Sequence, residues 1–171
     1  MNTKQILDYF EKTDKTLLMQ GKHLIGETEA GFFGISVLSD LLDVFKNINL
    51  SRFESFADLG SGDGRVVILA SVFTKAVGFE LDNKLINLAK KNKKALRSKA
   101  KFIRTDFTKI DLSVFDVLFI NPDKPFYRGL ENKLLQEFKG VLIVANPVFL
   151  PSFKEKQLFD YPGNPVFIYE L

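Results

Sequence analysis

Residues 56–70 read FADLGSGDGRVVILA, and this stretch decides the fold. It begins as a short apolar strand, passes through Gly60, Gly62 and Gly64 at alternate positions, and ends as an apolar helix. Because glycine lacks a Cβ atom, the backbone can turn sharply at positive φ and approach a ligand closely. The helix that begins near Gly64 directs free N–H groups at the loop, which favours a carboxylate or a phosphate. The stretch predicts a nucleotide-type binding loop, the alternative being only a tight strand-to-helix turn.

The spacing of the glycines separates two kinds of nucleotide site. A dinucleotide-binding loop has the pattern G-x-G-x-x-G, whereas here the third glycine, Gly64, comes one residue early and Arg65 holds the required position. An acidic residue, Asp58, stands two positions before the first glycine. The resulting pattern, D-x-G-x-G-x-G, disfavours a nicotinamide dehydrogenase.

This pattern resembles motif I of the class I S-adenosylmethionine-dependent methyltransferases. In that family the glycines pass under the amino-acid end of the cofactor, and the acidic residue lies near its amino group. The resemblance implies that Asp58, Gly60, Gly62 and Gly64 bind S-adenosyl-L-methionine. It also implies an α/β fold with a three-layer, Rossmann-like methyltransferase sheet that is mostly parallel.

A second carboxylate follows the next predicted strand. Residues 76–82 form an apolar run that ends in acid, and Glu80 comes about twenty residues after Asp58, the interval at which a strand-end carboxylate binds the hydroxyls of a cofactor ribose. Glu80 thus resembles motif II of the family. The alternative is that it caps the following helix together with Asp82.

A third carboxylate follows a short predicted strand over residues 101–105. In the family, an acid at this point binds the adenine amino group, and the next residue packs on the ring. The resemblance therefore assigns these roles to Asp106 and Phe107. The alternative for Asp106 is a helix or turn cap, a position that aspartate favours.

The fourth predicted strand ends in an Asn-Pro motif. Residues 115–127 read FDVLFINPDKPFY, and Asn121 lies at the carboxyl end of the strand, where open α/β sheets place their chemistry. The stretch resembles motif IV, Asn-Pro-Pro-Tyr/Phe, of amino-directed methyltransferases. There the asparagine oxygen and the proline carbonyl accept hydrogen bonds from the target amino group, and the aromatic residue packs against the substrate. The alternative is an ordinary strand-to-turn ending.

The chain departs from this motif because Asp123 and Lys124 replace the single second proline. The resemblance implies catalytic roles for Asn121, Pro122 and Asp123, and substrate contacts from the displaced aromatic residues. These aromatic residues are Phe126 and Tyr127.

The residues before the first strand predict a helical N-terminal part. Apolar spacing indicates one amphipathic helix, or two short ones, over 3–18 and another helix over about 30–45, with a glycine-punctuated loop over 21–31 between them. By resemblance, residues 1–50 form a cap or lid, and Thr28 contacts the cofactor. The alternative for Thr28 is the N-cap of the following helix.

The residues after the Asn-Pro motif complete one domain over residues 1–171, with a cofactor-binding core over 51–171. They predict a helix over 129–138 and a fifth strand over 141–145, followed by a second Asn-Pro. A terminal antiparallel hairpin is expected over 157–169, on either side of a Pro-Gly-Asn-Pro turn.

Composition excludes several classes of protein. The chain has no cysteine and one histidine, His23, so disulfides and thiol catalysis are impossible and a metal site is not expected. No signal peptide is recognisable, and no apolar stretch is long enough for a membrane span. We therefore expect a cytoplasmic protein without a membrane partner.

The net charge of +3 conceals a strongly basic segment. Residues 84–104 carry nine Lys or Arg and no Asp or Glu. The segment indicates either a solvated helix face or a surface for nucleic acid or another acidic partner.

The resemblance implies methyl transfer from S-adenosylmethionine to a nitrogen of a macromolecule, either protein or RNA. The length and the terminal hairpin resemble compact protein-lysine methyltransferases of archaeal type, which favours protein lysine. The Asn-Pro motif and the basic segment favour the alternative, an RNA base amino group. A third reading is a non-catalytic, cofactor-binding scaffold subunit, because the fourth motif is altered.

Overall fold

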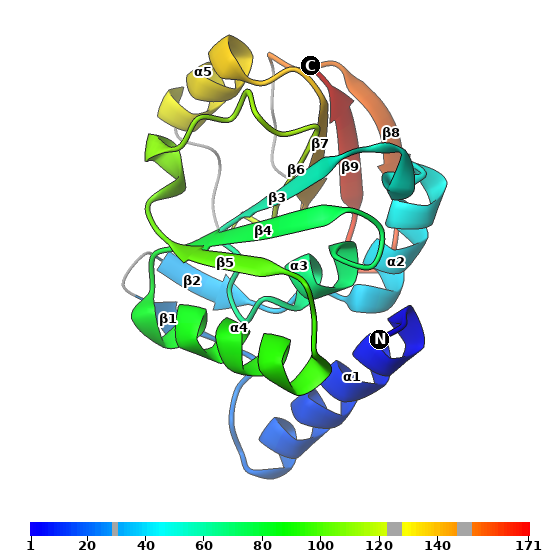
Figure 1. The fold of residues 1–171 in the computed structure, drawn as a ribbon, viewed down its shortest axis with the longest axis vertical. Coiled ribbons are helices and arrows are strands. Elements are labelled where there is room, and N and C mark those ends of the chain that lie inside the picture. Colours follow the sequence, from blue (N-terminus) through cyan, green and yellow to red (C-terminus); the bar gives the residue numbers. More distant parts are fainter. Residues whose placement is uncertain (29–30, 123–127, 147–151) are drawn as a thin grey trace.

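The protein is built around a seven-stranded sheet. The structure is a computed structural model, which describes residues 1–28, 31–122, 128–146 and 152–171. Five neighbouring strands are parallel, and the last two strand pairings at the C-terminal edge of the sheet are antiparallel (Figure 1). In spatial order the strands are β5 (Lys101–Arg104), β4 (Lys75–Glu80), β3 (Ser55–Leu59), β6 (Val117–Ile120), β7 (Val141–Ala145), β9 (Val166–Glu170) and β8 (Glu155–Phe159). The predicted fold class is confirmed, including the C-terminal antiparallel hairpin.

Helices cover both faces of the sheet, so the fold has three layers (Figure 1). On one face lie α1 (Thr3–Met19), α2 (Leu38–Asn47), α3 (Arg65–Ala70) and α4 (Asn83–Leu96), and on the other lies α5 (Arg128–Glu137). The alternation of β3 shows how the two layers are specified, because successive side chains of a strand point to opposite faces. Phe56 packs in the core with α1 and α2, whereas Ala57 packs in the core with Leu134 of α5.

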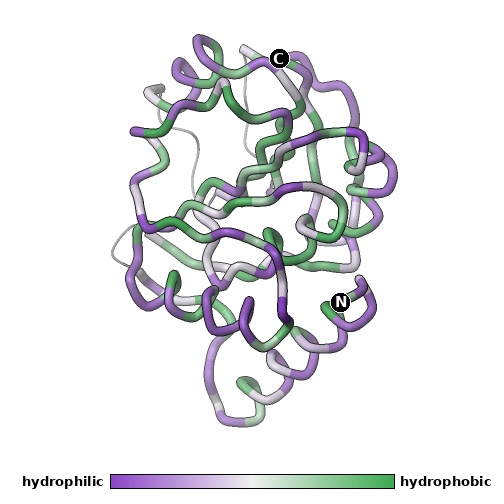
Figure 2. Tube along the Cα trace, in the orientation of Figure 1, coloured by the Kyte–Doolittle hydropathy of each residue, from purple (hydrophilic) through white to green (hydrophobic). Residues whose placement is uncertain are grey.

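Short 3₁₀ helices, η1 (Leu50–Arg52) and η2 (Phe107–Lys109), complete the chain between the longer elements. Hydrophobic residues follow the central strands, and hydrophilic residues predominate on the outer helices (Figure 2). Within the residues that the structure describes, no helix combines the length and the hydrophobicity that a membrane crossing needs.

The N-terminal prediction is wrong between residues 21 and 37. Instead of a loop followed directly by a helix, β1 (Ile25–Thr28) and β2 (Gly31–Gly34) form a separate two-stranded antiparallel sheet, and α2 begins only at Leu38. Glycine at both ends of β2 disfavours a helix, and Gly31 adopts a φ of 139°. Thr28 caps no helix, since its hydroxyl donates to the carbonyl of Gly31 (2.8 Å) within the hairpin.

Candidate functional site

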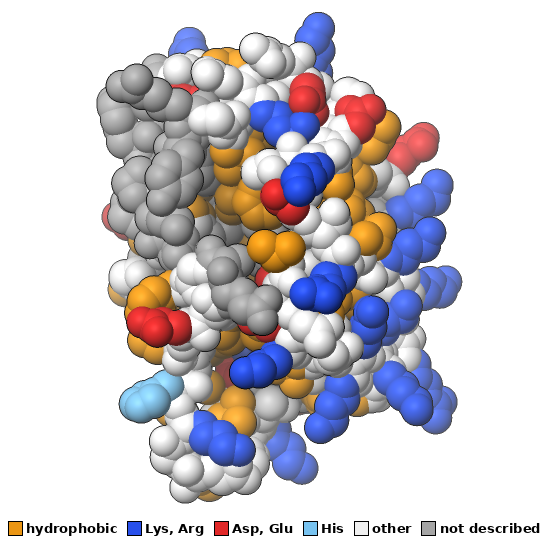
Figure 3. All heavy atoms as spheres, turned by 90° about the vertical axis from the view of Figure 1, so that its left-hand side faces the viewer, with side chains coloured by type: hydrophobic (Ala, Val, Ile, Leu, Met, Phe, Trp, Pro, Cys, Tyr) orange, Lys and Arg blue, Asp and Glu red, His pale blue; other side chains and the backbone are white. Residues whose placement is uncertain are grey.

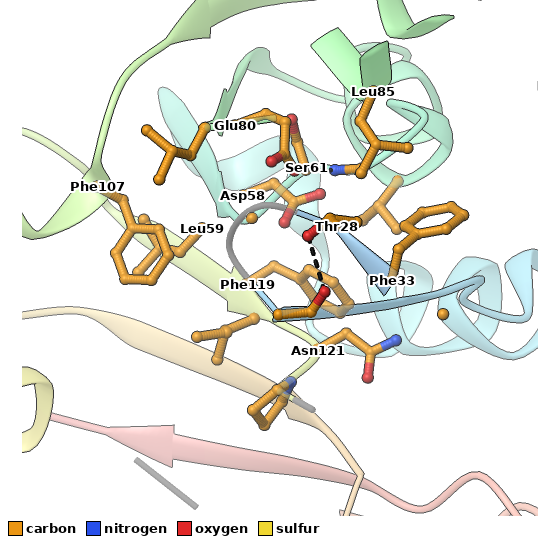
Figure 4. Close-up of a pocket in the computed structure, with 18 of the residues that line it drawn as sticks. Thr28, Phe33, Asp58, Leu59, Ser61, Glu80, Leu85, Phe107, Phe119 and Asn121 are labelled. Carbon is orange, nitrogen blue, oxygen red and sulfur yellow. Dashed lines mark hydrogen bonds between the residues drawn. The ribbon is translucent and has the colours of Figure 1, made fainter. Parts of the chain in front are cut away.

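A cavity of about 600 Å³ opens at the carboxyl ends of the parallel strands, where β3 has β4 on one side and β6 on the other. Chain order reverses at this point, and open α/β sheets bind ligands there. Figure 4 shows the carboxylates of Asp58 and Glu80 close to Ser61, with Asn121 farther away beyond Phe119. The volume lies within the range of small-molecule sites, roughly 300–1,000 Å³.

Most of the site residues predicted from the sequence come together here. Those that line the cavity are Thr28, Asp58, Gly60, Gly62, Glu80, Asp106, Phe107, Asn121 and Pro122. Gly64 is not among the lining residues. Asp123, Phe126 and Tyr127 lie outside the residues that the structure describes.

The glycine loop has the backbone that its sequence predicts. Gly60, Gly62 and Gly64 have φ values of 91°, 52° and 82°, which disfavour residues with a side chain. The amides of Gly60 and Ser61 both donate to the carbonyl of Phe79 (2.9 Å each), which ties the loop to β4. Two of the glycines therefore present backbone to the cavity.

Gly64 has a packing role instead. It precedes α3 as its N-cap, and a Cβ atom there would lie 2.6 Å from the ring of Phe102 and 2.8 Å from the methyl group of Ala89. Such distances are too short for carbon atoms, so Gly64 lets the loop approach β5 and α4 closely. The third glycine of the motif thus serves the fold.

Glu80 holds the glycine loop with both of its carboxylate oxygens. Oε2 accepts from the amide of Gly62 (2.9 Å), and Oε1 accepts from the amide of Asp82 (2.8 Å). Glu80 does not cap α4; that role belongs to Asp82, whose side chain accepts from the amides at the start of the helix. Each oxygen of Glu80 keeps further acceptor capacity toward the cavity, because a carboxylate oxygen has two lone pairs.

Asp58 is a buried carboxylate, one oxygen of which has no hydrogen-bond partner among the described residues. It is 2% exposed, and within the described residues its Oδ1 and the hydroxyl of Ser61 are the buried side-chain atoms without a hydrogen bond. Burial raises the pKa of Asp58 well above its usual range, and the nearby charges of Glu80 and Asp63 raise it further. The two orphaned atoms belong to residues that line the cavity, so this wall is built to receive a hydrogen-bonding or cationic group.

Arg65 is a buried cation that pairs with two carboxylates near the glycine loop, those of Asp14 and Asp63. Arg65 is only 5% exposed, and its guanidinium donates to both carboxylate oxygens of Asp63 and, in a bidentate pair at 2.9 Å, to Asp14 of α1. Burial acts to lower the pKa of Arg65, but the hydrogen bonds and charges of Asp14 and Asp63 outweigh it and raise the pKa. The guanidinium also lies 4.9 Å from the ring centroid of Phe10.

A second chain of hydrogen bonds connects α1 with the glycine loop. The hydroxyl of Tyr9 donates to Oδ1 of Asn92 (2.9 Å), whose Nδ2 donates to the carbonyl of Asp63 (3.0 Å). Helix α1 is therefore attached to the loop at two points, through Asp14 and through Tyr9. Sequence reasoning missed this attachment because nothing local relates residues that are about fifty positions apart.

Asp106 caps η2 and also lines the cavity. Its Oδ1 accepts from the hydroxyl (2.7 Å) and the amide (2.9 Å) of Thr108, and these hydrogen bonds lower the pKa of Asp106. Asp106 therefore has the capping role that was the alternative to cofactor binding. The ring of the neighbouring Phe107 lies at the cavity wall (Figure 4).

Beyond β6 the cavity is lined by the neutral amide of Asn121 and by Lys133 of α5. Nδ2 of Asn121 donates to the hydroxyl of Ser36 (3.1 Å), and Oδ1 of Asn121 accepts from Nδ2 of Asn146, which follows β7. Sequence reasoning gave Ser36 and Asn146 no role. The signal for Asn146 was a second Asn-Pro after the neighbouring strand.

The β1–β2 hairpin lines the cavity and contacts the glycine loop. Thr28 and Phe33 line the cavity, and a Cβ atom on Gly62 would come within 2.5 Å of the Phe33 ring. The ring therefore rests on Gly62. Sequence reasoning missed Phe33 because it read this segment as the start of a helix.

A family model described as the ANTKMT methyltransferase domain matches residues 58–157. This range begins at the orphaned carboxylate and includes every strand end described above. A search of curated proteins finds no match to the chain.

Solved structures share the fold. An RNA methyltransferase from Salinibacter ruber in complex with S-adenosyl-L-homocysteine has a TM-score of 0.65 and 21% identity, over 80% of this chain and 93% of that one. A putative methyltransferase, yhhF, from Escherichia coli has a TM-score of 0.60 and 17% identity, over 77% and 82%. The T. thermophilus 16S rRNA N2 G1207 methyltransferase, in complex with AdoMet and guanosine, has a TM-score of 0.61 and 17% identity, over 85% and 49%. At these identities the likeness establishes the fold.

Proposed function

The chain belongs to the ANTKMT methyltransferase domain family of S-adenosylmethionine-dependent enzymes, and we propose that it transfers a methyl group from S-adenosyl-L-methionine to a nitrogen of a macromolecule, most favourably a protein lysine. The observation that carries the proposal is the unpartnered, buried Oδ1 of Asp58 beside two cavity-lining glycines at positive φ.

The residues present fit this cofactor. S-adenosylmethionine carries an ammonium group, and Asp58 offers a buried carboxylate oxygen that lacks a cationic partner. Gly60 and Gly62 leave room for close approach of the amino-acid end. Glu80 offers acceptors to ribose hydroxyls, and Asp106 with Phe107 offers an acceptor and a ring face to adenine.

When bound, the cofactor supplies an activated methyl group, and the protein's part is to orient and desolvate. Methyl transfer needs the donor and the acceptor nitrogen nearly in line, so positioning contributes more than strong acid–base chemistry. Oδ1 of Asn121 and the carbonyl of Pro122 are the described acceptors suited to orient an amine. We also propose that Asp123, Phe126 and Tyr127 complete this acceptor side.

The N-terminal residues 1–50 act, in this proposal, as a cap on the cofactor. The contact of Phe33 with Gly62 and the place of Thr28 in the cavity wall support it. Because α1 is attached to the glycine loop through Arg65, the cap and the cofactor core are joined in one domain.

Two observations bear on the substrate. The matched family carries the name of a protein-lysine methyltransferase, which favours lysine. An RNA base amino group is the alternative, supported by the basic segment 84–104, which occupies the side of the molecule rich in Lys and Arg in Figure 3. Among the described residues, none of its nine cationic side chains forms an ion pair.

The experiment is a transfer assay with methyl-tritiated S-adenosylmethionine and a cell extract, followed by protease or nuclease digestion. We expect label that protease releases and nuclease leaves in place. Loss of the label with nuclease would replace lysine by RNA as the acceptor. Asp58→Ala, which removes the proposed ammonium ligand, is the inactive control.

A non-catalytic scaffold remains the competing reading from another class of function. It would bind S-adenosylhomocysteine in a calorimetric titration and yet label no fraction of the extract. Failure of both binding and labelling would overturn the proposed function altogether.

A further inference from the structure

The side chains that end β6 and β7 are joined directly. The two strands are parallel, with Ile120 opposite Val144, and each is followed by an Asn-Pro dipeptide. Nδ2 of Asn146 donates to Oδ1 of Asn121 across this edge. Asn121 lines the cavity, whereas Asn146 is not among the lining residues, so among the described residues Asn121 is the link between the Asn146 side chain and the cavity.

Asn146 is held in place by its backbone. Its φ is 75°, in the left-handed region that asparagine tolerates better than other residues with a side chain. Its amide donates to the carbonyl of Pro165 (3.1 Å) in the turn between β8 and β9. A left-handed residue at a strand end is an unfavourable conformation, and such conformations concentrate at functional sites.

The contacts of Asn146 leave Asn121 with one defined orientation. Nδ2 of Asn121 donates to Ser36, which is 7% exposed, and one lone pair of its Oδ1 is taken by Asn146. A carbonyl oxygen has two lone pairs, so one acceptor position remains. With both ends of the carboxamide fixed, that position has a fixed direction.

We propose that Asn146 is a positioning residue for methyl transfer, which holds Asn121 so that its remaining acceptor position faces the amino group of the substrate. This inference rests on the proposed function, and it extends the site to the second Asn-Pro and to the C-terminal hairpin.

The central test is Asn146→Gly, because glycine accepts a φ of 75° while removing the donor. We expect the initial rate of methyl transfer to fall about tenfold, which corresponds to loss of one well-placed hydrogen bond. The fall should appear in kcat rather than in the affinity for S-adenosylhomocysteine measured by calorimetry. The melting temperature should stay the same or rise.

Asn49→Gly is the matched control. Asn49 also has a left-handed φ, 51°, and it precedes η1 away from the cavity, so this variant repeats the backbone change without touching Asn121. Asn146→Asp is the complementary variant, since it keeps the shape of the side chain and replaces the donor by an acceptor. Its rate should fall at least as far as that of Asn146→Gly.

A spectroscopic readout that needs no substrate is the side-chain amide signal of Asn121 in a ¹⁵N–¹H spectrum. We expect it to shift and broaden in Asn146→Gly and to stay unchanged in Asn49→Gly. An unshifted Asn121 signal, or a wild-type transfer rate in Asn146→Gly, would overturn the inference. Because the parent protein's own binding and transfer test the proposed function, the two failures are distinguishable.

Discussion

The two sides of the cavity differ in the chemistry of their strand ends. At the carboxyl ends of β3 and β4 lie the carboxylates of Asp58 and Glu80, both buried, and Asp58 keeps one oxygen without a hydrogen-bond partner among the described residues. After β6 and β7 it places the amides of Asn121 and Asn146, which bond to each other. Among the described residues, the carboxylate side leaves one buried oxygen without a hydrogen bond, whereas the two amides of the other side bond to each other.

This difference supports the proposed division of the cavity into a cofactor side and a substrate side. A buried anion with a raised pKa favours a cation that arrives with its own charge, as the ammonium of S-adenosylmethionine does. A neutral, mutually bonded amide pair does not attract charge but fixes a direction, which suits the orientation of an uncharged amine. Variants on the carboxylate side should therefore lower the affinity for the cofactor, and variants on the amide side should lower the rate of methyl transfer.

The largest expected effect is a loss of folding stability when Arg65, the buried partner of two carboxylates, is removed. Arg65→Ala leaves Asp14 and Asp63 without their shared partner, and breaking one member of a buried pair costs about 3–5 kcal/mol. Urea unfolding should show a loss of this size.

Arg52→Ala is its control, because Arg52 also stacks on an aromatic ring, at 4.7 Å from Phe53, but is exposed. The free energy of unfolding of Arg52→Ala should stay within about 0.5 kcal/mol of that of the parent protein. Equal losses in the two variants would mean that the buried cluster does not hold α1 to the glycine loop.

The second effect concerns cofactor affinity. Asp58→Asn removes the proposed partner of the ammonium group, and we expect affinity for S-adenosylhomocysteine, which carries the same group, to fall about a hundredfold in a calorimetric titration. Asp111→Asn, an exposed carboxylate that caps a turn, should bind as the parent does. Unchanged affinity in Asp58→Asn would remove the carboxylate side from the cofactor site.

The third effect should appear on the amide side alone. Asn121→Ala removes the proposed acceptor of the substrate amine, and we expect methyl transfer to fall at least about tenfold while affinity for S-adenosylhomocysteine stays within twofold. A loss of affinity comparable to that of Asp58→Asn would erase the distinction between the two sides.

The smallest effect is a pH dependence of stability. The pKa of Asp58 is raised in the folded state, so the folded protein keeps a proton that the unfolded chain has lost. The contribution of Asp58 to stability is complete below its ordinary pKa of 3.8 and is lost as the pH rises through the folded-state value. The stability of Asp58→Asn relative to the parent protein should therefore increase as the pH rises through this window. A pH-independent difference in urea unfolding would contradict the raised pKa.

The carboxylate side was predictable from the sequence because its information is local. Asp58 and Glu80 lie at the carboxyl ends of β3 and β4, Asp106 follows β5, and parallel strands bring these ends to one edge of the sheet. The glycine spacing likewise predicted the loop, although only the structure shows that Gly64 serves packing.

The amide side and the N-terminal wall were less predictable because they depend on distant contacts. Asn146 bonds to Asn121, which follows the neighbouring strand β6, and Asp14 pairs with Arg65, which lies about fifty positions later in the chain. Residues 31–37 continue the apolar spacing of α2, yet Gly31 and Gly34 turn the segment into a strand, which brought Phe33 onto Gly62. Periodicity alone does not distinguish these outcomes.

The most direct test is a calorimetric titration of the parent protein and of Asp58→Asn with S-adenosylmethionine. We predict saturable binding of one cofactor per chain in the parent protein and an affinity about a hundredfold lower in Asp58→Asn. Absence of binding to the parent protein would contradict the assignment of the cavity, and equal affinities in the two proteins would contradict the role of Asp58.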